Sequence, residues 1–367
     1  MVPSEPSGRC QRIVKLTAAT IFVVSFLFCA AQVLSLPLLP GSILGSSSNG
    51  ANTPSEILTP ETQSEEIEGI YGLTHMQQLP KHLVPTPSNK RRLIIIGDIH
   101  GMDRALDKLL KKVKFDPKYD HVIAAGDMVN KGPHSAAVVS RLMEINASAV
   151  RGNHEDRILL ALAGAQARQS ASQLDDEPKF DAEGAKRDLK TARKLSTAQV
   201  KWLTQLPLIL DIDLLDMFVV HAGLVPGIKP RKQDPWAVMN MRTLVYPKQE
   251  LRRSGDFGED EEDDDEDSSE YEIDAENGTP VPIDTHEGRK WAPVWDHSQR
   301  SQRKHTRRTV VYGHDARRGL TVGKYTFGLD SGCVGKGQLT ALIVEADGEE
   351  GAWKSKIKQI ECKKLRK

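Results

Sequence analysis

Between residues 91 and 150, apolar runs of strand length alternate with segments that have helical periodicity. Residues 93–96 are continuously apolar, which is typical of a buried strand, and the run ends at Gly97. Residues 105–113 carry Leu and Val at helical spacing, which predicts a helix with one buried face. Further strands are predicted at 121–125, 147–150, 217–220 and 309–311, and a further helix at 136–145. This order of strands and helices predicts an α/β fold, in which functional sites lie at the carboxyl ends of strands.

A long apolar segment near the N-terminus predicts a membrane anchor. Residues 16–36 are about 21 mostly apolar positions, enough to cross about 30 Å of hydrocarbon. Basic residues precede this segment, and no Lys or Arg follows it before Lys81. The positive-inside rule therefore predicts a cytosolic tail at 1–15, an uncleaved transmembrane signal-anchor at 16–36 and a lumenal body. A cleaved signal peptide, with small residues at 29–31, is the alternative and would also deliver the body to a lumen.

The rest of the chain divides by composition. Residues 37–90 are rich in Ser, Pro, Thr and Gly and are predicted to form a flexible lumenal linker. The main domain is predicted at 91–345 with an acidic, disordered insertion at about 252–280, and a basic C-terminal tail is predicted at 346–367. Asn277 begins the sequence Asn-Gly-Thr within the insertion, and a lumenal body predicts that it is glycosylated.

The balance of charge conceals a basic body. Lys and Arg number 50, and Asp and Glu also number 50, but 13 of the acidic residues lie between Asp256 and Asp274. Without those 13, the chain has 37 acidic against 50 basic residues, a net charge of +13. This indicates either a polyanionic partner or simply a soluble surface. No nucleic-acid-binding motif accompanies the charge, so no nucleic acid partner is predicted.

Cysteine usage excludes a disulfide-rich scaffold. Only four cysteines occur, and Cys10 and Cys29 lie in the region of the predicted anchor. At most one disulfide is therefore possible in the body, between Cys333 and Cys362, and the sequence leaves open whether it forms. No Cys-x-x-Cys pair is present, which argues against a zinc site made of thiolates.

Five short polar clusters follow predicted strands, and each places Asp, Asn or His beside Gly. They are Gly-Asp-Ile-His-Gly at 97–101, Gly-Asp-Met-Val-Asn-Lys-Gly at 126–132, Arg-Gly-Asn-His-Glu at 151–155, Val-His-Ala-Gly at 220–223 and Tyr-Gly-His-Asp-Ala at 312–316. Alone, each Asp could be a helix cap and each His a core residue. Together, carboxylate, imidazole and amide groups at strand ends suit borderline divalent metals better than Ca²⁺ or a thiophilic ion.

With these clusters, residues 91–345 resemble the calcineurin-like metallophosphoesterase superfamily. The resemblance implies a two-sheet β-sandwich flanked by helices, with a dinuclear metal site at the strand ends. It also implies two divalent cations, with zinc favoured over cobalt, manganese or iron. The ligands it implies are Asp98 and His100 for the first metal, Asp127 as the bridge, and Asn153, His221 and His314 for the second metal.

Two departures from the superfamily pattern narrow this resemblance. Ala316 stands where many members have a second His. Asn130 and Lys131 stand where protein phosphatases have Asp and Arg, which argues against protein dephosphorylation. The segments at 126–133 and 311–316 resemble the fungal vacuolar zinc-dependent endopolyphosphatases, and those at 328–333 and 338–342 resemble the bacterial diadenosine tetraphosphatases.

The resemblance also implies roles for residues around the metals. Arg151 is expected to clamp a phosphate with its guanidinium, and Lys131 to act as a point charge in place of the Arg. His154 is the expected general acid for the leaving oxygen. Asn130 lacks the charge of the Asp that orients this His in protein phosphatases. A phosphate leaving group, which needs little protonation, is therefore favoured over an alkoxide.

A long anionic substrate would need further cations. The basic residues before the strand that leads to His314 are predicted to bind it, a solvated basic face being the alternative; they are Arg303, Lys304, Arg307 and Arg308. Arg242, in the insertion after His221, is a further candidate for substrate binding. The three Trp residues of this region are predicted to pack the insertion rather than stack on bases: Trp236, Trp291 and Trp295.

The sequence therefore predicts an endopolyphosphatase, which cleaves internal phosphoanhydride bonds of inorganic polyphosphate by attack of a hydroxide held between two metals. The alternatives among hydrolases are a dinucleoside polyphosphate hydrolase and a serine/threonine protein phosphatase. An inactive tethered module that only binds phosphate is the alternative of a different class, and the presence of all six expected ligands argues against it. The resemblance further implies a single-pass membrane protein with its body in the vacuolar lumen.

Overall fold

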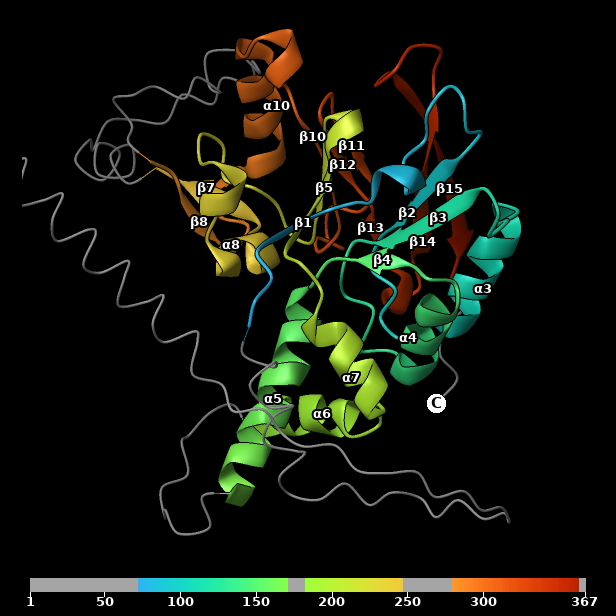
Figure 1. Cartoon of the computed structure of the whole chain (residues 1–367). Helices are drawn as coiled ribbons and strands as arrows, with labels where there is room; N and C mark the ends of the chain where they lie inside the picture. Colours follow the sequence, from blue (N-terminus) through green and yellow to red (C-terminus); the bar gives the residue numbers. More distant parts are fainter. Residues whose placement is uncertain (1–71, 171–181, 247–278, 363–367) are drawn as a thin grey trace, which may run out of the picture. The chain divides into compact units, whose positions relative to one another are not determined.

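The computed structural model describes residues 72–170, 182–246 and 279–362 (Figure 1). The predicted transmembrane segment, most of the predicted linker, nearly all of the acidic insertion and Asn277 lie outside these residues, so those predictions stay predictions. Within the described residues, no helix is both long enough and apolar enough to cross a membrane.

The first of two large sheets contains the strands predicted near residues 91–150. In this sheet β2 (Arg92–Ile96), β3 (Asp120–Ala124) and β4 (Ser148–Ala149) run parallel to one another. The long strand β14 (Gln338–Ala346) lies antiparallel to β2 and also pairs with β13 (Asp330–Ser331) and β15 (Trp353–Glu361). The resulting order is β13-β14-β2-β3-β4, with β15 beside β14.

The second large sheet has the strand order β1-β5-β6-β10-β12-β11. Its strands are β1 (Met76–Gln78), β5 (Ile209–Ile212), β6 (Met217–Val220), β10 (Thr309–Tyr312), β11 (Thr321–Val322) and β12 (Thr326–Gly328). A small third sheet contains β7 (Thr243–Val245), β8 (Val281–Ile283) and β9 (Arg289–Lys290). Because β6 and β10 are parallel, both end at the same edge of the second sheet.

Helices follow most of the strands. The α-helices are α3 (Asp103–Lys112), α4 (Ser135–Glu144), α5 (Asn153–Ser170), α6 (Ala182–Ala192), α7 (Thr197–Thr204), α8 (Pro235–Asn240) and α10 (Trp291–Ser301). Short 3₁₀ helices are η1 (Lys81–Leu83), η2 (Asp213–Leu215), η3 (Pro230–Lys232), η5 (Lys304–Thr306) and η6 (Cys333–Gly335). The helices predicted at 105–113 and 136–145 are confirmed as α3 and α4.

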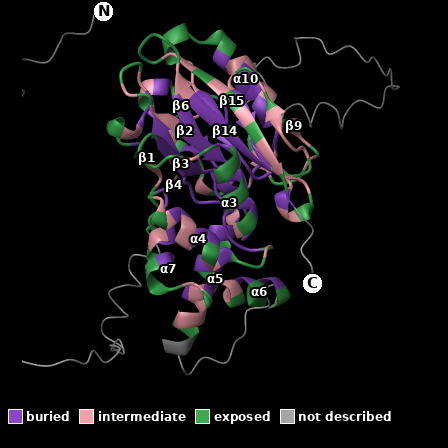
Figure 2. Cartoon of the chain, turned by 90° about the vertical axis from the view of Figure 1, so that its right-hand side faces the viewer, coloured by how far each residue is buried: buried purple, intermediate pink, exposed green. Residues whose placement is uncertain are grey.

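Alternation of side chains along the strands separates three apolar cores. Leu93 and Ile95 of β2 face the second sheet and pack in one core with Val219 of β6. Ile94 points to the opposite face and packs with residues of α3, α4, α5 and α7. The outer face of the second sheet packs against α8 and α10, where Trp291 is buried. Figure 2 shows these strands as buried purple ribbons. The fold is therefore a mixed α/β sandwich of two sheets with helices outside, as predicted.

Two segments outside the predicted domain belong to the fold. The stretch 72–90 is not a linker, because β1 pairs with β5 and because Leu79 and Val84 are buried. The predicted basic tail is also wrong, because β15 pairs with β14 along its whole length. Half-buried and exposed side chains alternate along most of β15. Its Lys residues face solvent, while Trp353 and Ile357 on the other face pack against the core that contains Leu93 and Val219. The many Lys residues of this segment suggested a solvated tail, although the segment forms a strand.

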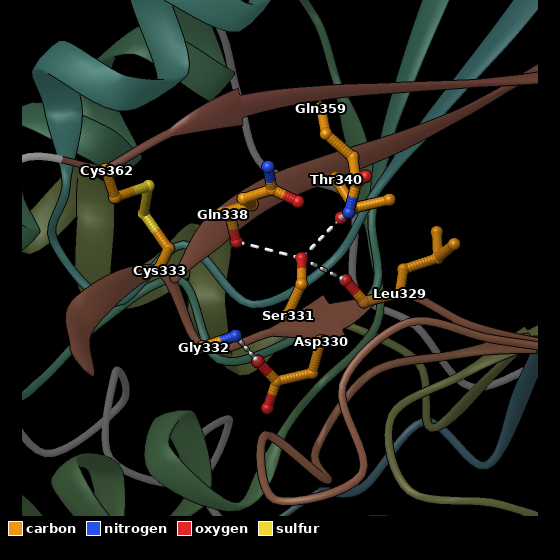
Figure 3. Close-up of a disulfide and its surroundings, with 9 residues drawn as sticks. All are labelled: Leu329, Asp330, Ser331, Gly332, Cys333, Gln338, Thr340, Gln359 and Cys362. Atoms are coloured by element: carbon orange, nitrogen blue, oxygen red, sulfur yellow. Dashed lines mark hydrogen bonds between the residues drawn. A yellow bond between two sulfur atoms is a disulfide. The ribbon is translucent and has the colours of Figure 1, made fainter. Parts of the chain in front are cut away.

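A disulfide joins the end of β15 to the turn after β13 (Figure 3). Cys333 in η6 is bonded to Cys362, and both side chains are buried. The bridge closes a loop of 29 residues, which in the chain-entropy account stabilises the fold by about 3–4 kcal/mol. In the same turn, the carboxylate of Asp330 accepts a hydrogen bond of 3.0 Å from the N–H of Gly332. The disulfide that the sequence left open is formed, and it braces a turn that reaches the edge described next.

Candidate metal centre

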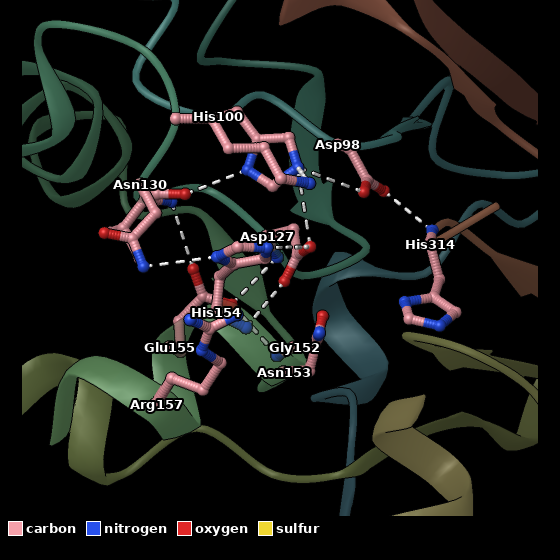
Figure 4. A network of polar contacts seen from close by, with 12 residues as sticks. Asp98, His100, Asp127, Asn130, Gly152, Asn153, His154, Glu155, Arg157 and His314 are labelled. Carbon is pink, nitrogen blue, oxygen red and sulfur yellow. Dashed lines mark hydrogen bonds and ion pairs between the residues drawn. The ribbon is translucent and has the colours of Figure 1, made fainter. Parts of the chain in front are cut away.

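The polar clusters converge at one edge of the two sheets (Figure 4). Their side chains are Asp98 and His100 after β2, Asp127 after β3, Asn153 and His154 after β4, His221 after β6, and His314 after β10. Parallel strands present their carboxyl ends at one edge, and this holds for β2, β3 and β4 and for the pair β6 and β10. All six residues that were expected to bind metal are therefore brought together.

Left-handed backbone conformations are concentrated at this edge. Positive φ angles occur at His100 (47°), Asp127 (49°), Asn130 (64°), Lys131 (59°) and His314 (71°). Residues other than glycine adopt this region infrequently, at a cost of about 1–3 kcal/mol each, and keep it only where their surroundings enforce it. The fold thus holds an unfavourable backbone at the point where these side chains meet, which is a feature of functional sites.

Two of the glycines in the clusters are required by close approach. Gly126 has φ of 87°, and a Cβ there would lie 2.6 Å from Nδ1 of His221. A Cβ at Gly313 would clash with Oδ1 of Asp98. Each glycine therefore lets a neighbouring strand end approach a buried polar side chain, which explains the pairing of Gly with Asp or His in the sequence.

Asp127 lies between two groups of candidate ligands and is 1% exposed. Its Oδ2 is 3.5 Å from Nε2 of His100, and its Oδ1 is 3.3 Å from Nε2 of His221. Ligand atoms of His100, Asp127 and His154 lie within 4.8 Å of one another, as do those of Asp127, His221 and His314. One carboxylate is thus common to two possible cation positions, as a bridging ligand must be.

Backbone carbonyls orient the three candidate imidazole ligands. Nδ1 of His100 lies 2.9 Å from the carbonyl of Val129, and Nδ1 of His221 lies 2.9 Å from the carbonyl of Ala125. In both rings Nδ1 donates to the carbonyl and Nε2 faces Asp127, so the neutral form of each ring has its lone pair on Nε2. In His314 the roles are reversed, because Nε2 lies 2.9 Å from the carbonyl of Asn240 and Nδ1 faces His221 at 3.2 Å. Such outer partners fix the tautomer of a metal-binding histidine.

Two oxygen atoms indicate that cations fit this site. Oδ2 of Asp98 is buried and has no hydrogen-bond partner among the described residues, while Oδ1 accepts the N–H of His314. The amide oxygen of Asn153 faces the carboxylate of Asp127, which can only accept, and lies 3.1 Å from Nε2 of His221. Burial, and then the charges of Asp330 and Asp127, raise the pKa of Asp98 well above its usual value. A cation between these groups would satisfy the orphaned oxygen and relieve the repulsion.

Burial and neighbouring charges also shift the pKa values of the histidines at this edge. Burial opposes a charge on His221, but the neighbouring carboxylate of Asp127 outweighs it and raises the pKa of His221 to about 10. Burial lowers the pKa of His154 to about 3, so its imidazole is neutral at neutral pH. Lys131 places Nζ 2.8 Å from Nε2 of His100, which brings a positive charge to the same edge. His154 and Lys131 therefore both lie at the edge that carries the candidate ligands.

Glu155 is a residue of the site to which the sequence assigned no role. It is 0% exposed, and its carboxylate accepts four backbone N–H groups. Oε2 accepts from Asp127 at 2.8 Å and from Gly152 at 2.9 Å. Oε1 accepts from Met128 at 2.8 Å and from Val129 at 3.1 Å. Glu155 thereby holds the loop that carries Asp127, and its only signal in the sequence is its place beside Asn153 and His154.

Arg151 does not join the cluster. Its side chain is buried, Nη2 donates to the carbonyl of Thr204 at 2.8 Å, and Nη1 lies 3.5 Å from Asp156. These partners belong to α7 and α5, so the guanidinium ties the strand end to the helices. The buried Nε of Arg151 has no hydrogen-bond partner among the described residues, and the expected role as a phosphate clamp stays a prediction.

The predicted basic track lies at the wrong end of β10. Arg308 directly precedes Thr309, the first residue of the strand, whereas His314 follows its last residue, and the length of the strand between them is about 10 Å. Arg308 instead pairs with Asp213 and Asp216, and Arg307 donates to Tyr325 and to carbonyls. We call the edge where the candidate metal ligands meet the metal edge. Arg308 is close to His314 in sequence but does not lie at this edge. Arg303 and Lys304 adjoin the same end of the strand at η5.

Two arginines and a histidine lie beside His314, gathered around one carboxylate. Oδ1 of Asp315 is 3.1 Å from Nη1 of Arg242 and 3.0 Å from Nε2 of His286, and Oδ2 is 3.1 Å from Nε of Arg318. Arg242 also donates to the carbonyl of His314 at 3.3 Å. The two arginines and the histidine remain partly exposed. We call this set the Asp315 cluster; Arg242 is the member that the sequence singled out as a substrate-binding residue.

The three Trp residues of the insertion differ in their exposure. Trp291 and Trp295 are buried in the core on the outer face of the second sheet, as predicted. Trp236 is 43% exposed, so the prediction that it packs the insertion is wrong. It lies on α8, and its carbonyl accepts a hydrogen bond from Asn240, whose own carbonyl contacts His314. An exposed indole is therefore one helical turn from a residue of the metal edge.

Comparison with known proteins is consistent with this geometry. The family model for calcineurin-like phosphoesterases matches residues 91–318. The chain is 27% identical over 297 residues to the symmetrical bis(5'-nucleosyl)-tetraphosphatase of Nitrosospira multiformis, covering 73% of this chain and 94% of that protein. It is 23% identical over 313 residues to the zinc-dependent endopolyphosphatase of Saccharomyces cerevisiae, covering 77% of this chain and 88% of that protein. A crystal structure of a protein proposed to be a diadenosine tetraphosphatase is similar with a TM-score of 0.52 and 28% identity, over 77% of this chain and 98% of that one.

Proposed function

Because the chain belongs to the calcineurin-like phosphoesterase family and is a metal-dependent hydrolase, we propose that it cuts internal phosphoanhydride bonds of inorganic polyphosphate. The observation that carries this choice of substrate is the Asp315 cluster, which holds two partly exposed arginines, Arg242 and Arg318, beside His314. A chain of linked phosphates needs such cations on both sides of the bond that breaks, whereas a single phosphate ester does not.

The proposed metal ligands are the buried groups that share the edge, with Asp127 between the two positions. They are Asp98, His100, Asp127, Asn153, His221 and His314. We favour zinc because imidazole, carboxylate and amide donors suit a borderline cation and because the Saccharomyces cerevisiae relative is zinc-dependent. When bound, the two cations supply Lewis acidity toward the phosphoryl oxygens and an activated water.

The remaining groups of the edge position and stabilise the substrate. Lys131 offers a point charge beside His100, close to where charge develops on the transferred phosphoryl group. His154, whose Nε2 lies 3.9 Å from Oδ2 of Asp127, faces the same space and can donate a hydrogen bond to the leaving oxygen. In the Asp315 cluster, Arg242 and Arg318 would bind the phosphates next to the scissile bond by charge-assisted hydrogen bonds.

The named relatives support a phosphoanhydride in preference to a phosphoprotein. One is a tetraphosphatase and the other an endopolyphosphatase, and both substrates contain linked phosphates. In this chain the residue that contacts Nδ1 of His154 is the amide of Asn130, at 3.2 Å, rather than a carboxylate. An amide does little to increase the acidity of the imidazole, which matters less when the leaving group is itself a phosphate.

We further propose that the body lies in an oxidising lumen, as the apolar segment at 16–36 predicts, with the vacuole as the expected compartment. The disulfide between Cys333 and Cys362 supports this, because disulfides persist mainly outside the cytosol. Protease treatment of intact vesicles should leave the body protected until detergent is added, and Asn277 should carry a glycan that an endoglycosidase removes. Digestion of the body without detergent would place it in the cytosol.

The substrate proposal is tested through the Asp315 cluster. Replacing Arg318 by Gln should raise the KM for long-chain polyphosphate by about tenfold, since a charge-assisted hydrogen bond contributes about 1.5 kcal/mol, with little change in the hydrolysis of p-nitrophenyl phosphate. Arg317 is exposed and makes no contact with Asp315, so Arg317→Gln is the matched control and should leave both substrates unaffected. Equal losses on both substrates would contradict a role in binding linked phosphates.

A second candidate function is supported by the exposed indole of Trp236. Its position one turn from Asn240 would let it stack on a nucleobase of a dinucleoside tetraphosphate whose phosphates lie at the metal edge. If that is the substrate, Trp236→Ala should lower kcat/KM for diadenosine tetraphosphate by about tenfold while polyphosphate hydrolysis is unchanged. A lack of effect on the dinucleotide would remove this candidate.

A further inference from the structure

Helix α6 brings an acidic side chain to His154 through an asparagine. Asp188 lies on this helix, and its Oδ1 accepts a hydrogen bond of 2.9 Å from Nδ2 of Asn130. The same Nδ2 is 3.2 Å from Nδ1 of His154 (Figure 4). Arg157 holds the other carboxylate oxygen, with Nε and Nη2 each 2.9 Å from Oδ2 of Asp188. Asn130, His154 and Asp188 are 6%, 8% and 7% exposed, so the contacts are made away from bulk water.

The carboxylate of Asp188 determines which way the Asn130 amide points. An ionised carboxylate only accepts hydrogen bonds, so it must face the amide nitrogen rather than the amide oxygen. The nitrogen that faces Asp188 also faces His154, and an amide nitrogen donates but does not accept. Nδ1 of His154 is therefore the acceptor, which leaves the imidazole proton on Nε2, the nitrogen nearer to Asp127.

We propose that Asp188 is a positioning residue that acts through Asn130 to fix the ring of His154 with Nδ1 toward the amide and its N–H at Nε2, on the side of Asp127, where it can donate a hydrogen bond to a phosphate leaving group. This inference rests on the proposed function, because it explains why a hydrolase of linked phosphates has an amide beside His154. It also gives α6 a role, since Asp188 is the part of that helix that reaches Asn130.

The chemistry of the leaving group provides the link to specificity. When a phosphoanhydride bond breaks, the P–O electron pair leaves with the bridging oxygen, and the departing phosphate is stable as an anion. The Nε2–H of His154 can stabilise that oxygen by a hydrogen bond and still keep its proton. An alkoxide is much more basic and must take a proton as it leaves, so a hydrogen bond alone assists it less. A carboxylate at position 130 would only accept, so it would favour the proton on Nδ1 and remove the tautomer that the amide enforces.

The tautomer can be measured without substrate or metal. In the full-length protein labelled with ¹⁵N-histidine, the His154 signals are identified by their loss in His154→Ala. The wild type should show Nε2 protonated and Nδ1 bare at neutral pH. Asp188→Asn removes the obligatory acceptor, so the Asn130 amide can turn over and a substantial fraction of His154 should carry its proton on Nδ1. Unchanged signals in Asp188→Asn would overturn the proposal.

Kinetics provide a second readout with a control on the same helix. Asp188→Asn should lower kcat for polyphosphate by about tenfold, while KM and zinc content stay the same, because substrate and metal contacts are not altered. Glu183 is an exposed acid on α6, so Glu183→Gln removes a similar charge and should have no effect. A change in KM or zinc content that accounts for the loss would show that Asp188 has a merely structural role.

A double variant tests leaving-group selection directly. Asn130→Asp combined with Asp188→Asn exchanges the amide and the carboxylate and places the carboxylate beside His154. The ratio of kcat/KM for polyphosphate to kcat/KM for an alkyl phosphate should then fall by at least tenfold, and an unchanged ratio would contradict the proposal. The outcomes also separate the two proposals. A wild type with the expected tautomer but no activity on polyphosphate would refute the proposed substrate alone, whereas an active wild type with its proton on Nδ1 would refute the role of Asp188 alone.

Discussion

The carboxylate of Glu155 is predicted to be the main support of the loop that carries Asp127. Glu155→Gln keeps the size of the side chain but replaces one acceptor oxygen by an NH₂ group. Whichever way the amide turns, two backbone N–H groups then face a donor, because each carboxylate oxygen now accepts two of them. Hydrogen bonds to a charged group contribute about 1.5–3 kcal/mol each, so the loss should be about 3–6 kcal/mol.

This loss is large relative to the stability of a domain, which is about 5–15 kcal/mol. Urea unfolding of the metal-free protein at pH 8 measures it, at a pH above the value of about 7 to which burial raises the pKa of Glu155. Glu144 is an exposed acid at the end of α4 that pairs with Arg141 at 3.4 Å, so Glu144→Gln is the matched control. It should cost no more than about 0.5 kcal/mol.

The same variant should also weaken metal binding, because the loop of Asp127 loses its anchor. A Glu155→Gln protein that is destabilised by less than about 1 kcal/mol would refute the reasoning, since at least two buried donors must lose a charged partner. A protein that is destabilised as expected but binds zinc normally would show that the loop holds its position without Glu155.

Three further predictions concern the metal bridge, acid stability and the disulfide. Asp127→Asn should abolish turnover and lower the zinc content measured by mass spectrometry, and normal activity would end the two-metal account. Burial lowers the pKa of His121 to about 4, below its unfolded value of 6.5. Between pH 6.5 and pH 4 the unfolded chain therefore binds more protons at this residue than the folded protein does. Stability should therefore fall by about 3 kcal/mol as the pH drops from 6.5 to 4, and His121→Gln should flatten this part of the urea-unfolding profile. Cys362→Ser should lower the unfolding free energy by about 3–4 kcal/mol and remove its sensitivity to reductant; a variant as stable as the oxidised wild type would show that the bridge to Cys333 contributes nothing.

Much of the site could be predicted because its determinants are local. A continuous apolar run such as 93–96 followed by Gly and Asp indicates both a buried strand and its functional end. Parallel strands of one sheet share an edge, so the strand ends at Asp98 and Asp127 could be expected to meet, whereas His221 reaches them from the second sheet. The structure brings these groups together, and it shows why each is accompanied by glycine at points of close approach.

The rest could not be predicted because it depends on contacts that sequence distance does not reveal. Arg308 is only six positions from His314, yet a strand lies between them. Arg151 adjoins the cluster in sequence, but its Nη2 and Nη1 contact Thr204 and Asp156 rather than the candidate ligands. Asp188 carries no motif, and only the packing of α6 places it against Asn130.

Composition misled in a similar way at the two ends of the domain. The segment 72–90 has few apolar residues, but an edge strand of three residues needs few, because the strand beside it supplies most of the buried surface. The Lys residues of β15 suggested a solvated tail, although their alternation with half-buried residues is the pattern of a strand with one solvent face.

The central claim is that the metal edge cuts linked phosphates at internal bonds. The most direct measurement is to incubate the full-length protein, loaded with zinc, with polyphosphate of uniform long chain length and to resolve the products on a gel over time. The account predicts fragments of intermediate length from the earliest time points, and none with Asp127→Asn. Release of single phosphates alone, or no cleavage with zinc, cobalt, manganese or magnesium while a phosphopeptide or diadenosine tetraphosphate is hydrolysed, would contradict it.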